Sequence, residues 1–276
     1  MDHDSVKPAD RDPALERLRG PKIAVSLAGA SGRPLQASGF LRPVIALGEG
    51  ALRGRAGAYG VTEQQPDGDK TPIVASALNA VDQERLDLAV MEQAFALAEP
   101  MAEGGRPPLL ILPLSWSSVR NARSRRKLLR LAAEGQMKLR NLPVCEITGI
   151  ETGTPQAALR EATGQLQPIF RGVLAKASPN RRVIRDLTDC GFTGAAVEAA
   201  ELGDAEDEAA MLRTVLAMQK IGSGVLVHAV RSVAGLTSVR AAGASWASLD
   251  IVPGASDSAG LAALTKTAAG ETPTAA

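Results

Sequence analysis

Short apolar runs alternate with amphipathic stretches along the chain between residues 41 and 251. The runs are nearly continuous in apolar residues, which is typical of strands buried in a parallel sheet. The stretches between them carry apolar residues mostly on one side, as helices that cover a sheet do. The pattern predicts strands at residues 41–47, 53–62, 108–114, 143–150, 169–177, 194–200, 224–230 and 246–251. It predicts helices at residues 82–99, 119–133, 155–166, 180–190, 205–221 and 233–242.

The number of these strand–helix units and the length of the chain favour a closed barrel. Periodicity alone does not separate a closed barrel from an open, doubly wound sheet. We therefore predict an α/β fold, a TIM-like (β/α) barrel, over residues 21–252. Residues 1–20 mix charges with proline and are expected to form a flexible, polar lead-in. Residues 253–276 are rich in Ala, Gly, Ser, Thr and Pro and are expected to form a disordered tail.

The composition fits one large domain and excludes several classes of function. Of the 276 residues, 45% are hydrophobic, and the formal net charge of +1 argues against a dedicated nucleic-acid-binding surface. No apolar run approaches the roughly 20 residues that span a bilayer, and the polar N-terminus has no signal segment. We expect a cytoplasmic protein without membrane contact. Cys145 and Cys190 lie in no disulfide or thiol motif, and both are expected to be buried and reduced.

Prolines, glycines and apolar residues are spaced in a recognisable order between residues 41 and 61. The positions that carry the pattern are Pro43, Val44, Ile45, Leu47, Gly50, Leu52 and Gly54. In this order they resemble the opening motif of the EAL-domain family of cyclic di-GMP phosphodiesterases. The resemblance extends over roughly residues 35–251 and rests on ordered spacing more than on exact motifs. It implies a barrel with two divalent metal ions at the C-terminal ends of its strands, which activate a water for phosphodiester hydrolysis.

The residues on which that chemistry depends are almost all replaced. The family's acidic, amide and basic positions fall, in chain order, on Ala56, Gly60, Pro113, Gly149, Ala175, Lys176, Ala196, His228 and Arg231. Pro113 stands where the family has a metal-binding asparagine, and His228 stands at a catalytic glutamate. Ala175 and Lys176 replace two metal-bridging aspartates. Glu146 alone keeps the residue type that the family has at its position.

Glu146 cannot hold a two-metal centre by itself, because hard divalent ions need several oxygen ligands. Lys176 adds a cation that repels a divalent ion by several kcal/mol at about 4 Å. The sequence therefore predicts no metal, no cofactor and no phosphodiesterase activity. Two interpretations of Glu146 stay open: a remnant of the family's metal site, or a buried carboxylate paired with Lys176 or another base. For His228 the alternatives are a general base and a structural residue.

Basic residues offer two candidate binding sites. The first is an anion site at neighbouring strand ends, formed by Lys176, His228 and Arg231. The second is the strongly basic run at residues 120–130, whose candidate docking residues are Arg125, Arg126 and Lys127. The alternative for this run is an ordinary solvated helix face. If the run does dock a partner, the overall charge favours an acidic protein over nucleic acid.

These observations lead to a functional hypothesis with two alternatives. We expect a catalytically inactive EAL-like domain that acts as a regulatory protein-interaction module in bacterial cyclic di-GMP-related signalling. Its protein partner is unidentified, and the resemblance implies that the chain forms a homodimer. The first alternative is a metal-free receptor for cyclic di-GMP or another phosphate-bearing ligand. The second, which the missing ligands disfavour most, is residual phosphodiesterase activity.

Overall fold

A computed structural model describes residues 20–30, 32–65, 68–74, 77–102, 108–203, 208–251, 260, 261 and 263. Of the predicted lead-in, only Gly20 is among these residues. Of the predicted tail, only residues 260, 261 and 263 are. The predictions of flexibility and disorder at the two ends therefore lie outside the described residues.

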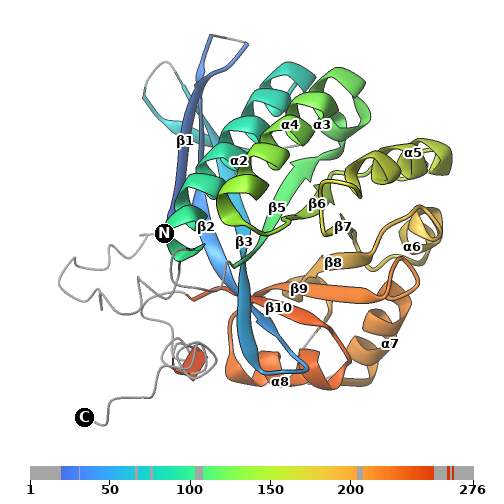
Figure 1. Ribbon diagram of the computed structural model, residues 1–276. Coiled ribbons are helices and arrows are strands. Elements are labelled where there is room, and N and C mark those ends of the chain that lie inside the picture. Colours follow the sequence, from blue (N-terminus) through green and yellow to red (C-terminus); the bar gives the residue numbers. More distant parts are fainter. Residues whose placement is uncertain are drawn as a thin grey trace, which may run out of the picture.

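Eight strands of one sheet close into a barrel (Figure 1), so the predicted TIM-like (β/α) fold is confirmed. Around the barrel the order is β2, β10, β9, β8, β7, β6, β5 and β3, and a pairing between β2 and β3 closes the ring. β2 is antiparallel to both of its barrel neighbours, whereas the other pairs are parallel. The strand bounds are β2 Pro34–Ala46, β3 Ala51–Gln64, β5 Leu109–Ser115, β6 Val144–Thr148, β7 Gly172–Lys176, β8 Gly194–Glu198, β9 Gly224–Val230 and β10 Trp246–Leu249.

Helices follow the parallel strands and cover the outside of the barrel, and α2 packs against α4 (Figure 1). Their bounds are α2 Ala80–Ala102, α3 Trp116–Arg120, α4 Ala122–Leu139, α5 Gln156–Leu166, α6 Arg181–Leu187, η3 Ala199–Glu201, α7 Glu208–Met218 and α8 Val233–Ala241. The single helix predicted at residues 119–133 is therefore two helices. The chain breaks at Asn121, whose side chain caps α4 by accepting from the N–H groups of Arg123 and Ser124. Each helix in the described part of the chain is too short or too polar to cross a lipid bilayer.

The sequence pattern missed two strands outside the closed ring. β1 (Lys22–Ala28) pairs antiparallel with the first half of β2, and β4 (Lys70–Ile73) pairs antiparallel with the end of β3. β2 also begins at Pro34, seven residues before the predicted strand. The carboxylate of Asp82, in the first turn of α2, accepts the N–H of Ala30 at 2.8 Å. This bond ties the turn between β1 and β2 to the helix layer.

Strand side chains alternate between two apolar layers. Outward residues pack beneath the helices in the larger core cluster. Inward residues form a smaller cluster inside the barrel, which consists of Val44, Ala56, Ile111, Val144, Leu174, Ala196 and Leu226. Ala56 and Ala196 stand at positions where the family resemblance expects charged functional residues. Here both are fully buried and form part of the apolar filling of the barrel.

The packing of α2 on α4 predicts opposite effects for two glycine substitutions. A Cβ atom on Gly135 of α4 would lie 2.4 Å from the Phe95 ring of α2, so Gly135→Ala should lower the free energy of unfolding by about 1–2 kcal/mol. A Cβ atom on Gly164 of α5 would meet nothing within 4 Å. Gly164→Ala should therefore raise the free energy of unfolding by up to about 1 kcal/mol, because alanine favours helix. Urea denaturation measures both, and two changes of the same sign would contradict this packing.

Candidate functional site

The barrel interior contains a buried chain of polar side chains near the C-terminal ends of its strands. Glu146 on β6 is 2% exposed and His228 on β9 is 3% exposed. The two lie on strands that are not neighbours, and Nε2 of His228 is 2.5 Å from Oε2 of Glu146. On its other side, Nδ1 of His228 is 3.0 Å from Oγ of Ser248, which also accepts the N–H of Ala229 at 3.2 Å. The imidazole is therefore held between a carboxylate and a hydroxyl.

Charge compensation keeps Glu146 ionised despite its burial. Burial alone would raise the pKa of Glu146, but the His228 imidazole and the Lys176 ammonium outweigh it, and the net direction is down. Because the carboxylate is ionised, it accepts a hydrogen bond, so Nε2 of His228 carries a proton. A depressed carboxyl pKa stabilises the fold above the usual glutamate range, and this contribution is lost as the pH falls through that lowered pKa.

Lys176, at the end of β7, is also paired. Its Nζ lies 2.5 Å from Oε1 of Glu198 at the end of β8. Burial lowers the pKa of Lys176, but the charges of Glu146 and Glu198 outweigh burial and raise it, so the ammonium stays charged. Of the two interpretations of Glu146, the structure supports a paired carboxylate, with His228 as its hydrogen-bonded partner. The same contact favours the structural alternative for His228, which stays a prediction.

Arg231 completes the set of cations that the sequence placed at this end of the barrel. Its Nε lies 2.9 Å from Oδ2 of Asp250, and the other carboxylate oxygen of Asp250 is 3.1 Å from Nη2 of Arg42. Each cation of the predicted anion site, namely Lys176, His228 and Arg231, is thus in contact with a carboxylate. The anion site stays a prediction, and this pairing weighs against it because the nearby carboxylates offset the positive charge.

The side chains at this end of the barrel do not fit a two-metal centre. Such a centre needs several oxygen ligands, including carboxylates that bridge the ions. Pro113 and Ala175 have no ligating side-chain atom, and Glu146 and Glu198 are engaged by the cations described above. Within the described residues, no three His, Cys, Asp or Glu side chains are gathered so that they could hold a metal ion.

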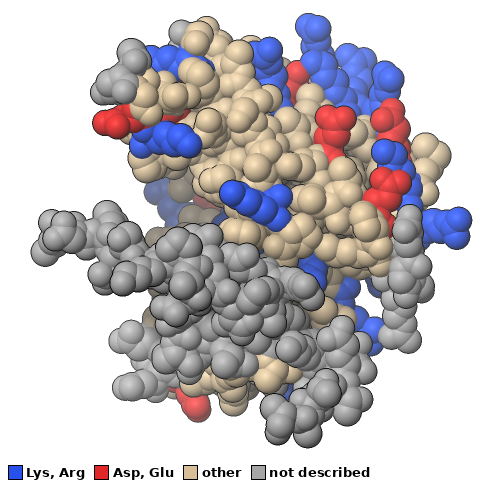
Figure 2. Space-filling view, turned by 90° about the vertical axis from the view of Figure 1, so that its left-hand side faces the viewer, with Lys and Arg blue, Asp and Glu red and all other residues tan. Residues whose placement is uncertain are grey.

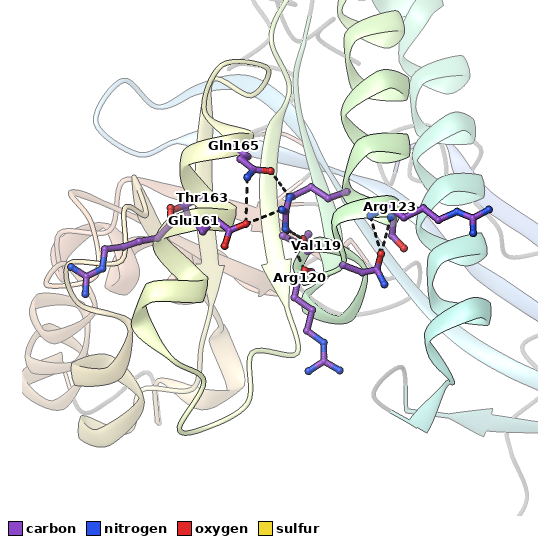
Figure 3. Close-up of polar contacts among 10 residues, drawn as sticks. Val119, Arg120, Arg123, Glu161, Thr163 and Gln165 are labelled. Atoms are coloured by element: carbon purple, nitrogen blue, oxygen red, sulfur yellow. Dashed lines mark hydrogen bonds and ion pairs between the residues drawn. The ribbon is translucent and has the colours of Figure 1, made fainter.

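Arg125 corrects the predicted docking surface, because it is buried with 4% exposure. Its guanidinium donates from Nη1 to the carbonyl of Val119 at 2.7 Å and from Nε to Oε1 of Gln165 at 2.7 Å. Nη2 donates to Glu161 at 3.2 Å (Figure 3). Arg125 therefore joins the end of α3 to α5 and is not available to a partner. The basic run hides this role, because Arg125 lies one turn before the buried Leu128 on the inner side of α4.

The other two predicted docking residues, Arg126 and Lys127, are both exposed but differ in their contacts. Lys127 pairs with Glu84 of α2, whereas Arg126 is exposed. Arg120 and Arg123 are also exposed, and their side chains point away from the Arg125 network (Figure 3). On the face shown in Figure 2, Lys and Arg side chains gather toward the upper right with Asp and Glu among them.

Several residues of the interior network were not singled out from the sequence as site residues. No sequence motif contains Ser248, Asp250 and Arg42 together. Arg42 is distant in the sequence from the other two residues, and they meet only when β2 and β10 pair. Glu198 gave a weak signal, since it ends an apolar strand next to the one that ends at Lys176. A charged residue at the end of each of two neighbouring parallel strands predicts such a pair.

The fold is that of EAL domains, so the resemblance inferred from residues 41–61 is confirmed at the level of fold. The EAL enzyme Bd1971 in its cGMP-bound form aligns with a TM-score of 0.60 and 11% identity over 92% of this chain and 66% of that one. The EAL domain of Mycobacterium smegmatis DcpA aligns with a TM-score of 0.56 and 14% identity, over 83% and 95% of the two chains. The FimX EAL domain from Pseudomonas aeruginosa, bound to c-di-GMP, gives 0.52 and 16%, over 86% and 91%.

This chain spans just under two thirds of the Bd1971 chain, which has further parts. A scan against protein-family models found no match, and a search of curated proteins found none. At these identities the structural likeness establishes the fold and not the activity.

The position of Arg125 predicts unequal costs for two neighbouring substitutions on α4. Arg125→Ala should lower the free energy of unfolding by about 2–4 kcal/mol, because it removes the donor to the carbonyl of Val119 and to the side-chain oxygen of Gln165. Arg126→Ala should change it by no more than about 0.5 kcal/mol. Chemical denaturation of both variants provides the measurement. Equal effects would show that Arg125 is not the structural link described here.

Proposed function

We propose that this chain is a catalytically inactive EAL-fold protein that acts by binding a partner protein in bacterial cyclic di-GMP-related signalling. One observation carries the proposal: the carboxylates at the C-terminal strand ends are held by basic side chains of the chain itself. The pairs are Glu146 with His228 and Glu198 with Lys176. The link to signalling rests on the likeness to EAL structures, among them one bound to c-di-GMP.

Catalysis would require these internal pairs to break. A divalent ion at Glu146 would have to displace His228 and approach the charged ammonium of Lys176, which repels it. Separating a buried carboxylate from its partner costs several kcal/mol. A single glutamate provides too few oxygen ligands for metal binding to offset that cost. Residual hydrolysis is therefore the least supported of the three hypotheses. The receptor alternative faces a smaller cost, since Lys176 and Arg231 are partly exposed.

The partner surface we propose is the exposed basic face of α3 and the start of α4. It consists of Arg120, Arg123 and Arg126, which form no ion pair with any residue that the structure describes. Guanidinium groups bind carboxylates through paired hydrogen bonds, so the face fits an acidic segment of another protein. Arg125 anchors this face from beneath by holding α3 to α5.

The first test measures nucleotide chemistry directly. The purified chain is incubated with cyclic di-GMP and either Mg²⁺ or Mn²⁺, with an active EAL phosphodiesterase assayed in parallel, and linear product is followed by chromatography. We expect no product above the buffer control. Calorimetric titration with cyclic di-GMP, with and without Mg²⁺, should give no binding heat.

Any other result of the hydrolysis assay or the titration would favour one of the alternative functions. Binding without metal that is lost in Lys176→Met would replace the interaction module with the receptor alternative. Binding or hydrolysis that requires Mg²⁺ would contradict the account of the paired carboxylates. A thermal melt of Lys176→Met separates loss of binding from loss of folding.

The second test addresses the partner surface. Arg123→Glu combined with Arg126→Glu should remove the proteins that co-purify with the full chain from native cell extracts. The matched control is Arg181→Glu with Arg182→Glu, two exposed arginines at the start of α6. We expect this control to retain the same partners. Equal loss in both variants would indicate nonspecific charge attraction, and retention in both would place the docking surface elsewhere.

A further inference from the structure

A cavity of about 920 Å³ opens at the end of the barrel where the parallel strands begin. This is the end opposite to Glu146, Lys176 and His228. We call it the N-terminal cavity. Its wall includes the first residues of four strands: Leu109 of β5, Val144 of β6, Gly172 of β7 and Gly224 of β9. Its volume falls within the range of pockets that bind small organic molecules.

Three of the inward positions that line the cavity are glycines, which carry no side chain into the barrel. Barrels of this type are normally filled by three layers of side chains, with branched residues dominating. Here the inward positions at the start of β7 and β9 are Gly172 and Gly224, and Gly54 occupies the corresponding place on β3. The next inward layer contains Ile111 and Leu174, which form an apolar floor. Side chains therefore fill the middle of the barrel and leave this end hollow.

One wall of the cavity is aromatic. The half-buried Trp246 begins β10, and its ring lies across Gly224. A Cβ atom on Gly224 would be only 3.0 Å from the indole, so glycine is what allows the ring to lie there. Trp246 therefore contributes an aromatic ring to the cavity wall, and aromatic rings stack on one another.

The rim of the cavity is positively charged. Among the described residues, Arg53, Arg55 and Arg171 line it together with one acid, Glu49. Glu49 is engaged by Arg53, to which it is hydrogen-bonded and ion-paired. This leaves Arg55 and Arg171 without a carboxylate partner among the described residues. The excess charge at this end contrasts with the C-terminal end, where Lys176, His228 and Arg231 each contact an acid.

Arg55 also has an unsatisfied donor. Its Nη1 is one of two buried side-chain N or O atoms in the described residues that have no hydrogen-bond partner; the other is Oγ of Ser118. Burial lowers the pKa of Arg55, which reflects the cost of holding this cation away from water. Arg55 also lines the cavity, and an anion beside its guanidinium would offset the cost of holding this charge away from water.

We propose that the N-terminal cavity binds a small organic anion with a planar ring, whose phosphate or carboxylate contacts Arg55 and Arg171 and whose ring stacks on Trp246. The guanidinium groups provide paired donors for an oxyanion, the indole provides the stacking surface, and the apolar floor excludes water from the ring. The site is separate from the proposed partner surface and from the paired carboxylates. The proposed site would let a small molecule bind at the end of the barrel opposite to the position of the EAL-type metal site.

Calorimetric titration of the full chain tests the site with four probes. GMP and AMP represent a ring with a phosphate, 4-hydroxybenzoate represents a ring with a carboxylate, and inorganic phosphate is the anion alone. We expect saturable binding of at least one ring-bearing probe and weaker binding of phosphate. Arg171→Gln and Trp246→Leu should each weaken that binding by about tenfold or more. Arg181→Gln, an exposed arginine at the start of α6 beyond the other end of the barrel, should leave it unchanged.

Three results would overturn the proposal. They are no saturable binding of any probe at millimolar concentration, phosphate binding as tight as that of the ring-bearing probes, or binding that survives both Arg171→Gln and Trp246→Leu. Binding that depends on Lys176 rather than on Arg171 would place the ligand at the C-terminal end instead. Because Arg171 is exposed, its substitution tests the charge without disturbing the core, and a thermal melt checks the Trp246 variant.

Discussion

The buried carboxylate of Glu146 is the constraint on which the C-terminal end of the barrel depends. A charge with 2% exposure is tolerated only if the chain supplies compensation. His228 supplies it at 2.5 Å from another strand of the barrel, and Ser248 fixes the far side of the imidazole. Ala229, next in sequence, has a φ of 58°, an unusual value for a residue other than glycine. Its N–H bonds to Ser248, so the same hydroxyl holds both the ring and the strained backbone beside it.

The two ends of the barrel solve the problem of charge in opposite ways. At the C-terminal end, Glu146, Glu198 and Asp250 each contact at least one basic side chain of the same chain. At the N-terminal end, Arg55 and Arg171 have no matching acid among the described residues, and both line a cavity. A barrel whose internal charges are satisfied gains little from a ligand at that end. The end with an unsatisfied guanidinium is where a bound anion lowers the free energy most.

Much of the fold could be predicted from the sequence because the parallel strands are continuous apolar runs. The run at residues 224–230 is a strand with the predicted bounds, and the other parallel strands differ at their ends by a few residues. The strand β1 was missed although Ile23, Val25 and Leu27 alternate with the small residues Ala24 and Ser26. A short run of this kind next to a charged lead-in gives a weak signal. β1 is stabilised by its pairing with β2, and the local pattern of apolar residues does not reveal which strand a segment pairs with.

The site was less predictable than the fold, and Arg125 shows why. Its neighbours in sequence are exposed bases, so composition places it on a solvated face, but helical geometry aligns it with the buried Leu128 and Ala132. The chain break at Asn121 then brings the carbonyl of Val119 within its reach. Likewise, Glu146 and His228 could be identified from spacing as isolated residues. Their contact depends on barrel closure, which sequence spacing does not reveal.

Barrel closure and the polar network are also separable, which bears on how the family's chemistry could be lost while the fold remained. The antiparallel pairing of β2 with β3 and β10 closes the ring, and apolar side chains fill the layers on both sides of the strands. Neither interaction uses a residue that would bind metal. Replacing ligands at positions such as Ala56 and Ala196 even enlarges the apolar interior, because methyl groups take the place of charges that would need compensation. The packing that holds this barrel together therefore does not depend on metal-binding residues.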